Sequence, residues 1–333
     1  MGALSLVEPR AEAPDPKPTS YRFWHKYRLE QLGLIRKRID TVMDDMTRQF
    51  SLFDEPAPAP PARPQLAVTT APLARSGDGR SPQNDLGAVL SPSQVNKYLN
   101  CSAAWWFRYG AKLPDPASGA MVRGRVVHKM AETYFRARLA GERMEADDFG
   151  DLFQVAWDEA AADAVFADAA DHDEHYRVAG VLTRLYLTEV APGIEPAAVE
   201  LAVSGSINGV PVRGFVDLVD TSGRIIDLKT AKAAPSGISS DYAFQLATYR
   251  QLLPGASGEA RLTTLVATKV PKAVTLDYTV SAADQLMTLH LYPHVREGIR
   301  EGLYFPNRCS NLCSRKYCNF ADACEKEFGG KVE

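Results

Sequence analysis

Hydrophobic and polar residues follow two different rhythms along the chain. Over 21–50 and through most of 91–190, apolar residues recur every three or four positions, which is the spacing of one face of an α-helix. After Pro196 the period becomes two, as in β-strands, and it continues to residue 231. The pattern then predicts a helix over 241–253, a strand over 263–270 and a helix to about Gly302. The strands are therefore expected only after Pro196, between helical segments.

The first helix of the folded part has a clear start signal. Ser91 can accept a hydrogen bond from the first helical turn, and Pro92 suits the first helical position. The helical spacing is then kept by the apolar residues Val95, Tyr98, Leu99, Trp106 and Phe107. A second helix is predicted over 119–140.

Composition divides the N-terminal quarter of the chain into three segments. Residues 1–20 are rich in Pro, Ala and charge, which predicts a disordered tail. The amphipathic pattern predicts a helix within 21–53, and the dense Pro, Ala, Gly and Ser of 54–88 predict a linker. A single folded domain is then expected over 89–333.

Overall composition narrows the class of protein. Of the 333 residues, 45% are hydrophobic and 24% are charged, which is ordinary for a globular protein. No apolar run approaches the roughly 20 residues of a membrane helix, and the N-terminus lacks a secretory signal, so we expect a soluble cytoplasmic protein. The net charge of −3 does not favour a histone-like nucleic-acid coat, although it allows a local basic groove.

Two turn signals fix the register of the strands between 197 and 231. Asn208-Gly209 predicts a two-residue hairpin, which pairs residues whose numbers sum to 417 and so places Glu200 opposite Asp217. A second turn centred on Ser222 pairs numbers that sum to 444, which places Asp217 opposite Asp227. The three carboxylates are therefore predicted to lie side by side on adjacent strands.

Such a row of carboxylates needs a compensating charge. Like charges in direct cross-strand contact are destabilising, whereas oxygen ligands suit Mg²⁺ or Mn²⁺. Lys229 projects from the same face as Asp227, and the other side chains expected on this face, Phe215, Val219 and Ile225, are apolar, which predicts a buried face. The alternative is a surface hairpin whose acids point to water. The apolar neighbours and the lysine favour a metal site.

The same residues resemble a known signature. G-F-V-D, followed ten residues later by I-I-D-L-K, is similar to the motif of PD-(D/E)XK nucleases in their RecB and Cas4 branch. The resemblance implies that Asp217, Asp227 and the Leu228 carbonyl hold the metal and that Lys229 is catalytic. In this branch an upstream helix carries a metal-binding histidine, and R-G-R-V-V-H supplies it as His128.

The resemblance extends to the following helix and to the fold. The branch carries a Q-x-x-x-Y helix after the D-x-K strand, and Q-L-A-T-Y supplies it as Gln245 and Tyr249, four residues apart on one helical face. Glu200 is expected to be an occasional metal ligand or to support the ligands. The implied fold is α/β (α+β), with a restriction-endonuclease-like core in which helices flank a central mixed sheet.

Four of the five cysteines lie in the last 25 residues. Cys313, Cys318 and Cys324 follow at C-x₄-C-x₅-C, and Cys101 lies far upstream; this arrangement resembles the four-cysteine 4Fe–4S site of the Cas4 and RecB-like nucleases. Zinc sites more often use paired C-x₂-C motifs, which are missing here. The spacing leaves zinc open as the bound metal and Cys309 open as a substitute for Cys313.

A short motif precedes the linker. Gln49-Phe50-Ser51-Leu52-Phe53 resembles the peptide through which bacterial proteins bind the sliding clamp, with Phe50 in place of the usual leucine. The linker after it provides the flexible tether that such peptides need. The alternative is the frayed end of the amphipathic helix.

Together these resemblances imply a Mg²⁺- or Mn²⁺-dependent DNA exonuclease. It is expected to hydrolyse phosphodiesters at single-stranded DNA ends in recombination, repair or replication. The alternative is a catalytically silent DNA-binding adaptor, recruited by the clamp, on the same fold. The complete set of Asp217, Asp227 and Lys229 favours the enzyme.

Overall fold

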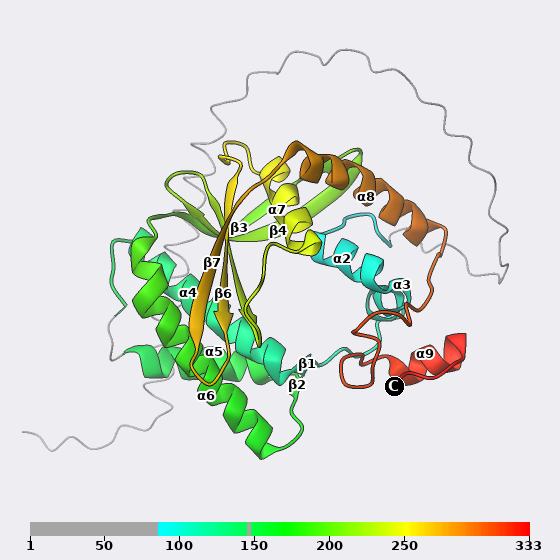
Figure 1. Cartoon of the computed structure of the whole chain (residues 1–333), viewed down its shortest axis with the longest axis horizontal. Coiled ribbons are helices and arrows are strands. Elements are labelled where there is room, and N and C mark those ends of the chain that lie inside the picture. Colours follow the sequence, from blue (N-terminus) through cyan, green and yellow to red (C-terminus); the bar gives the residue numbers. More distant parts are fainter. Residues whose placement is uncertain (1–85, 145–147) are drawn as a thin grey trace, which may run out of the picture. The chain divides into compact units, whose positions relative to one another are not determined.

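The computed structural model describes residues 86–144 and 148–333 (Figure 1). These residues lie in a compact unit that spans Asp78–Glu333. The predicted tail, the helix within 21–53, its Gln49–Phe53 motif and most of the predicted linker lie outside the described residues.

A five-stranded mixed sheet forms the centre of this unit, as predicted. Its strands run in the order β3-β4-β5-β6-β7, where β5 and β6 are parallel and the other neighbours are antiparallel. The strands are β3 (Pro196–Ile207), β4 (Val210–Asp220), β5 (Ile225–Ala231), β6 (Glu259–Val266) and β7 (Lys272–Thr279). A separate pair of two-residue strands, β1 (Ala117–Ser118) and β2 (Ala164–Val165), precedes Pro196, so strands begin earlier than predicted.

Helices cover both faces of the sheet (Figure 1). On one face, residues of α2, α7 and α8 form a core with the strands around Phe244 and Tyr292; on the other face, α4 and α6 pack around Phe135 and Leu182. The helices are α2 (Pro92–Asn100), α3 (Ser102–Trp105), α4 (Gly119–Leu139), α5 (Phe149–Ala161), α6 (Ala169–Leu185), α7 (Ser240–Leu252), α8 (Ala282–Arg300) and α9 (Ala321–Phe328). None of the helices in the described part of the chain combines the length and apolar character that a bilayer crossing requires.

The start of the first helix follows the sequence, but its continuation does not. The Ser91 side chain accepts from the backbone N–H of Gln94, and Pro92 occupies the first turn of α2. Cys101 then takes an extended backbone, with φ −160° and ψ 103°, so the predicted continuous helix is broken there into α2 and α3. Cys101 therefore lies between two helices and not on one.

Hydrogen bonds fasten the C-terminal segment to this break. The backbone N–H of Ala103 and the Ser102 hydroxyl both donate to the Phe305 carbonyl, at 3.1 Å each. The Asn319 side chain donates to Asp115, at 2.7 Å, which in turn pairs with Lys97 and Arg108. The two ends of the described chain thus meet, and α9 lies near α3 in Figure 1.

Candidate active site

The hairpin of β3 and β4 has the register that the sequence predicts. Asn208 and Gly209 have φ values of +47° and +76°, as a tight hairpin turn requires. The pairing runs from Ile207 and Val210 to Ala198 and Val219 with a constant sum of 417. Glu200 therefore lies opposite Asp217.

The register between β4 and β5 is also as predicted, but the pairing stops early. Leu218 faces Ile226, which gives the expected sum of 444, and the two strands then separate before Asp217 and Asp227 can pair. At this gap the Asp217 carboxylate accepts the backbone N–H of Leu228, at 2.9 Å. The side chain thus takes the place that a strand carbonyl would have in a continued ladder.

The side chains of both hairpin strands change faces at the rung of Glu200 and Asp217. In β4, Val216 packs with α7 and α8, whereas Leu218, which regular alternation would put on the same face, packs under α4. In β3, Val203 and Val199 differ in the same way. Glu200 has a left-handed backbone, φ +47°, which is uncommon for a residue other than glycine and provides this change in β3.

This change of faces corrects one prediction. Val219 and Ile225 are buried, but they pack in the core on the α7 and α8 side, not beside Asp217. Phe215 lies on the same face as Asp217, beyond the cover of α4, and is 59% exposed. The face is therefore not buried along its whole length.

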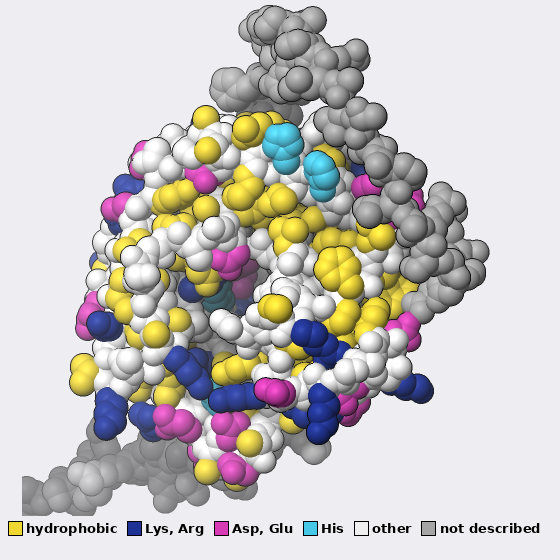
Figure 2. All heavy atoms as spheres, turned by 45° about the vertical axis from the view of Figure 1, so that its right-hand side comes forward, with side chains coloured by type: hydrophobic (Ala, Val, Ile, Leu, Met, Phe, Trp, Pro, Cys, Tyr) yellow, Lys and Arg dark blue, Asp and Glu magenta, His cyan; other side chains and the backbone are white. Residues whose placement is uncertain are grey.

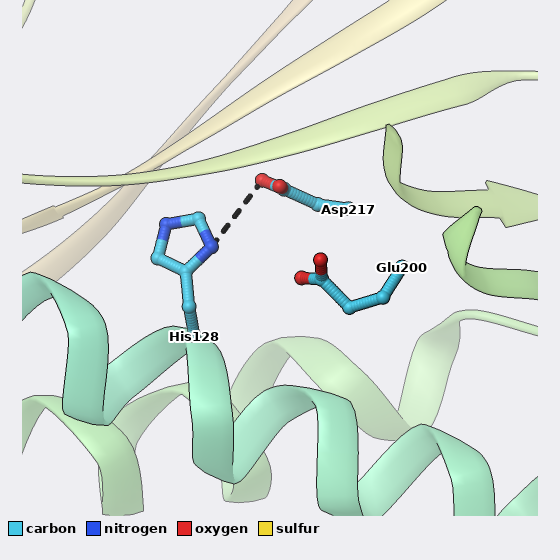
Figure 3. A group of neighbouring side chains, drawn as sticks. All are labelled: His128, Glu200 and Asp217. Carbon is cyan, nitrogen blue, oxygen red and sulfur yellow. Dashed lines mark ion pairs between the residues drawn. The ribbon is translucent and has the colours of Figure 1, made fainter. Parts of the chain in front are cut away.

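His128 comes from α4 and meets the two carboxylates of the hairpin. One ligand atom from each of His128, Glu200 and Asp217 lies within 4.8 Å of the other two. The His128 Nδ1 lies 3.5 Å from an Asp217 carboxylate oxygen, and both side chains are partly buried (Figure 3). Two hard oxygens and one imidazole nitrogen form a donor set that suits Mg²⁺ or Mn²⁺.

Asp227 and Lys229 form the other half of the site. The Lys229 ammonium lies 2.6 Å from the Asp227 carboxylate, which is 3% exposed. Gln245 of α7 donates to the other Asp227 oxygen at 2.7 Å. His128, Glu200 and Asp217, which we call the trio, meet beside α4, whereas Gln245 of α7 holds the Asp227–Lys229 pair. Asp227 is not part of the trio.

The electrostatics differ between the two halves. Burial raises the pKa of the Asp227 carboxyl and Asp217 adds to the shift, while Lys229 opposes it. Burial alone would lower the pKa of Lys229, but Asp227 and Asp217 outweigh it and raise the pKa. Lys229 is therefore an ammonium group at neutral pH, a hydrogen-bond donor and not a base.

The Glu200 carboxyl resists ionisation. Burial, together with the charges of Asp217 and Glu132, raises its pKa from 4.5 to about 7. Arg136 and Lys129 of α4 act in the opposite direction without cancelling the shift. A cation between the three side chains would remove most of this repulsion.

Two tyrosines of α7 lie near this half of the site. Tyr249 is 7% exposed and packs against Gly214, where an added Cβ would come within 2.6 Å of its ring. It therefore lies in the core on the α7 and α8 side and not on the surface. Tyr242, which the sequence reasoning missed, places its ring 5.5 Å from the Lys229 ammonium; no sequence motif indicates it.

A sequence profile identifies the family. The profile of the PD-(D/E)XK nuclease superfamily matches residues 89–325. The chain belongs to the PD-(D/E)XK nuclease superfamily. Nucleases of this superfamily use divalent metal ions and bind DNA, which agrees with the donor set of His128, Glu200 and Asp217.

Individual proteins add little to this assignment. A crystal structure described as "Putative exonuclease" from Eubacterium rectale is 13% identical and covers 79% of this chain and 96% of its own, with a TM-score of 0.48. The structure of SSO0001 is 11% identical and covers 69% of this chain and 96% of its own, with a TM-score of 0.31. At these TM-scores neither likeness carries an argument. No curated protein sequence matches the chain.

The fold of this superfamily member also gathers the predicted cysteines. Cys324 is buried, Cys101, Cys313 and Cys318 are half-buried, and Cys309 is exposed. Burial raises the pKa of Cys318 and of Cys324. Cys101 and Cys313 raise both further and Cys318 also raises the pKa of Cys324, whereas Cys309 contributes to neither. Among the described residues, the thiols that influence one another are those of the predicted set.

Proposed function

We propose that the chain is a metal-dependent DNA exonuclease of the Cas4/RecB-like branch. Its substrates are single-stranded DNA ends in recombination, repair or replication. The observation that carries the proposal is the convergence of His128, Glu200 and Asp217 beside the Lys229–Asp227 pair. An adaptor that only binds DNA would not need a buried lysine–aspartate pair next to a cation site.

In this proposal the metal site is built from both halves. His128, Asp217, Asp227 and the Leu228 carbonyl would hold the ion, and Glu200 would be an additional ligand. The ion supplies Lewis-acid chemistry, in that it neutralises charge on the scissile phosphate and lowers the pKa of water. Asp217 is already oriented for this role, because the Leu228 N–H fixes one of its oxygens.

Lys229 is the catalytic cation. Its ammonium donates hydrogen bonds, so it can orient a water molecule or an oxygen of the phosphate as negative charge develops there. Gln245 donates to the Asp227 oxygen that does not face Lys229, and Tyr249 is buried one turn farther along α7. These two residues keep Asp227 and Lys229 in position, so their effect on cleavage is indirect.

Cleavage of end-labelled DNA tests this proposal. The full chain, purified anaerobically, should degrade linear single-stranded DNA in Mg²⁺ or Mn²⁺ but leave a closed single-stranded circle intact. Asp217→Asn and Lys229→Ala should each lower the rate by at least about 100-fold, whereas Glu159→Gln, on the exposed face of α5, should leave it unchanged. Metal-independent cleavage, or full activity in either site variant, would refute the assignment.

We also propose that Cys101, Cys313, Cys318 and Cys324 bind a 4Fe–4S cluster. The basis is the resemblance of the four cysteines to the 4Fe–4S site of this branch, together with the burial of Cys324 and the partial burial of the other three thiols. A 4Fe–4S cluster takes one thiolate on each iron. Such a cluster would fasten the C-terminus to the break between α2 and α3.

The proposal includes recruitment by the bacterial sliding clamp. Its basis is the sequence alone, because Gln49, Phe50, Ser51, Leu52 and Phe53 lie outside the described residues. A nuclease tethered to the clamp by a Pro-rich linker would be concentrated at replicating DNA.

A further inference from the structure

The outer face of the β3–β4 hairpin continues from the metal site to the turn without cover from the described helices. On this face Ala202 pairs with Phe215 and Ser204 pairs with Arg213, and all four residues are exposed or partly exposed. The β3 side chains on this face are small, so the larger side chains of Phe215 and Arg213 on β4 project beyond them. The face lies directly beyond the rung of Asp217.

Phe215 is exposed without a structural reason. It is 59% exposed, whereas its strand neighbours Gly214 and Val216 are buried. Its side chain therefore adds little to the core, and an exposed phenyl ring costs solvation free energy. It lies two positions before Asp217, so the ring stands about 7 Å along the strand from the metal ligand.

The charge of this face favours a polyanion. Residues 201–216 contain no aspartate or glutamate, and their one charged residue is Arg213. Arg213 is exposed and forms no ion pair with another described residue. Arg213, Phe215 and Asp217 thus follow one another on the same face at steps of about 7 Å.

We infer that this face is the track on which single-stranded DNA approaches the metal site. A base next to the scissile phosphate stacks on Phe215, and a phosphate farther along the strand pairs with Arg213. The inference rests on the proposed nuclease function and adds to it the residues that select the substrate. A stacking ring and an arginine are the two elements of sequence-independent single-strand binding.

The geometry favours a single strand over a duplex. Bases in a duplex are stacked on each other, so an exposed aromatic ring can stack only on a base that is unpaired or at an end. The small residues Ala202 and Ser204 on the neighbouring strand leave the Phe215 ring open to such a base. Phe215 would therefore select unpaired ends.

Binding of a labelled oligodeoxythymidylate tests the track. Fluorescence anisotropy is measured with Ca²⁺ in place of Mg²⁺, so that the DNA is not cleaved. Phe215→Ala should weaken binding by about 5- to 150-fold, the range expected for loss of one base–aromatic stack, and Phe215→Tyr should restore it. Val155→Ala, which removes an exposed apolar side chain from α5, is the matched control and should bind as the wild type does.

Salt dependence separates the two contacts. Arg213→Ala should reduce the slope of log affinity against log salt concentration by about 0.7, because one phosphate contact is lost. Phe215→Ala should keep the wild-type slope, since stacking releases no counterions. A 2-aminopurine placed near the end of the strand should be less quenched in the Phe215→Ala complex than in the wild-type complex.

The outcomes distinguish this inference from the function on which it rests. Wild-type affinity in Phe215→Ala, or equal losses for a blunt duplex and a single strand, would overturn the track. An unchanged salt slope in Arg213→Ala would remove the phosphate contact and with it the proposed path. If the wild-type protein binds DNA through these residues but cleaves none, the track stands and the nuclease proposal fails.

Discussion

Neutralising Glu200 is expected to stabilise the metal-free protein and to weaken its binding of the metal. The raised pKa means that the folded protein keeps a proton on this carboxyl which the unfolded chain has already lost. Glu200→Gln is close in shape and permanently neutral, so it removes the cost of ionising this site. The same change removes a metal ligand.

The sign and size of the effect follow from the pKa. Below the ordinary value of 4.5 both states are protonated, and the variant and the wild type should be equally stable. Between 4.5 and about 7 the unfolded state releases its proton first, so the wild type loses stability as the pH rises. A rise from 4.5 to about 7 corresponds to about 3 kcal/mol, which we reduce to about 1–2 kcal/mol because water reaches part of the side chain.

Thermal or urea unfolding in EDTA measures this difference. At pH 8 the free energy of unfolding of Glu200→Gln should exceed that of the wild type by about 1–2 kcal/mol, and each kcal/mol should raise the melting temperature by roughly 2–4 °C. At pH 4.5 the two proteins should be equally stable. Addition of Mn²⁺ at pH 8 should stabilise the wild type more than the variant, because the variant has one ligand fewer. Glu159→Gln is the control for charge removal on an exposed helix.

Two results would contradict this reasoning. A variant that is less stable than the wild type in EDTA at pH 8 would mean that Glu200 is not destabilised by burial and by its acidic neighbours. A difference that stays constant between pH 4.5 and pH 8 would mean that another property of the side chain, and not its ionisation, is responsible.

Three further predictions concern the other parts of the chain. Tyr242→Ala should slow DNA cleavage several-fold by freeing the lysine that its ring faces, while Tyr242→Phe should retain activity; equal rates in all three proteins would exclude this contact. Cys324→Ser should abolish the broad absorbance near roughly 400 nm and lower the stability, whereas Cys309→Ser should keep both; loss of colour in the second variant would reassign the ligand. Exchange of Leu52 and Phe53 for alanine should abolish capture by the sliding clamp while nuclease activity persists, and unchanged capture would end that proposal.

Strand register could be predicted because it depends on local turn chemistry. Asn208 and Gly209 tolerate positive φ, so the hairpin turn is fixed at one place, and the pairs from Ile207 and Val210 to Ala198 and Val219 follow from it. The same arithmetic worked across the second turn as far as Leu218 and Ile226. The start of α2 was predictable for a similar reason, since Ser91 satisfies the backbone of its own first turn.

Features that depend on tertiary packing could not be predicted. The extended backbone at Cys101 interrupts a stretch with uninterrupted helical spacing, and the hydrogen bonds at this break come from about 200 residues away. The edge strand β7 was missed. Its Lys272, Asp277 and Thr279 are exposed, so the strand lacks the apolar pattern of a buried one. The left-handed backbone of Glu200 has no signal in its residue type.

The irregular rung explains why the acidic residues lie where they do. A regular ladder would also place Glu200 and Asp217 on one face, but it would turn Val199 and Leu218 to the opposite face. The change of faces instead brings Val199 and Leu218 under α4 beside the two acids and His128, and β4 separates from β5 there so that the Leu228 N–H can donate to Asp217. The costs of this arrangement are a strained backbone at one residue and carboxylates that repel each other. Because the repulsion falls on the rung where a cation would be bound and would be relieved by it, the site gains affinity for the ion by being unfavourable without it.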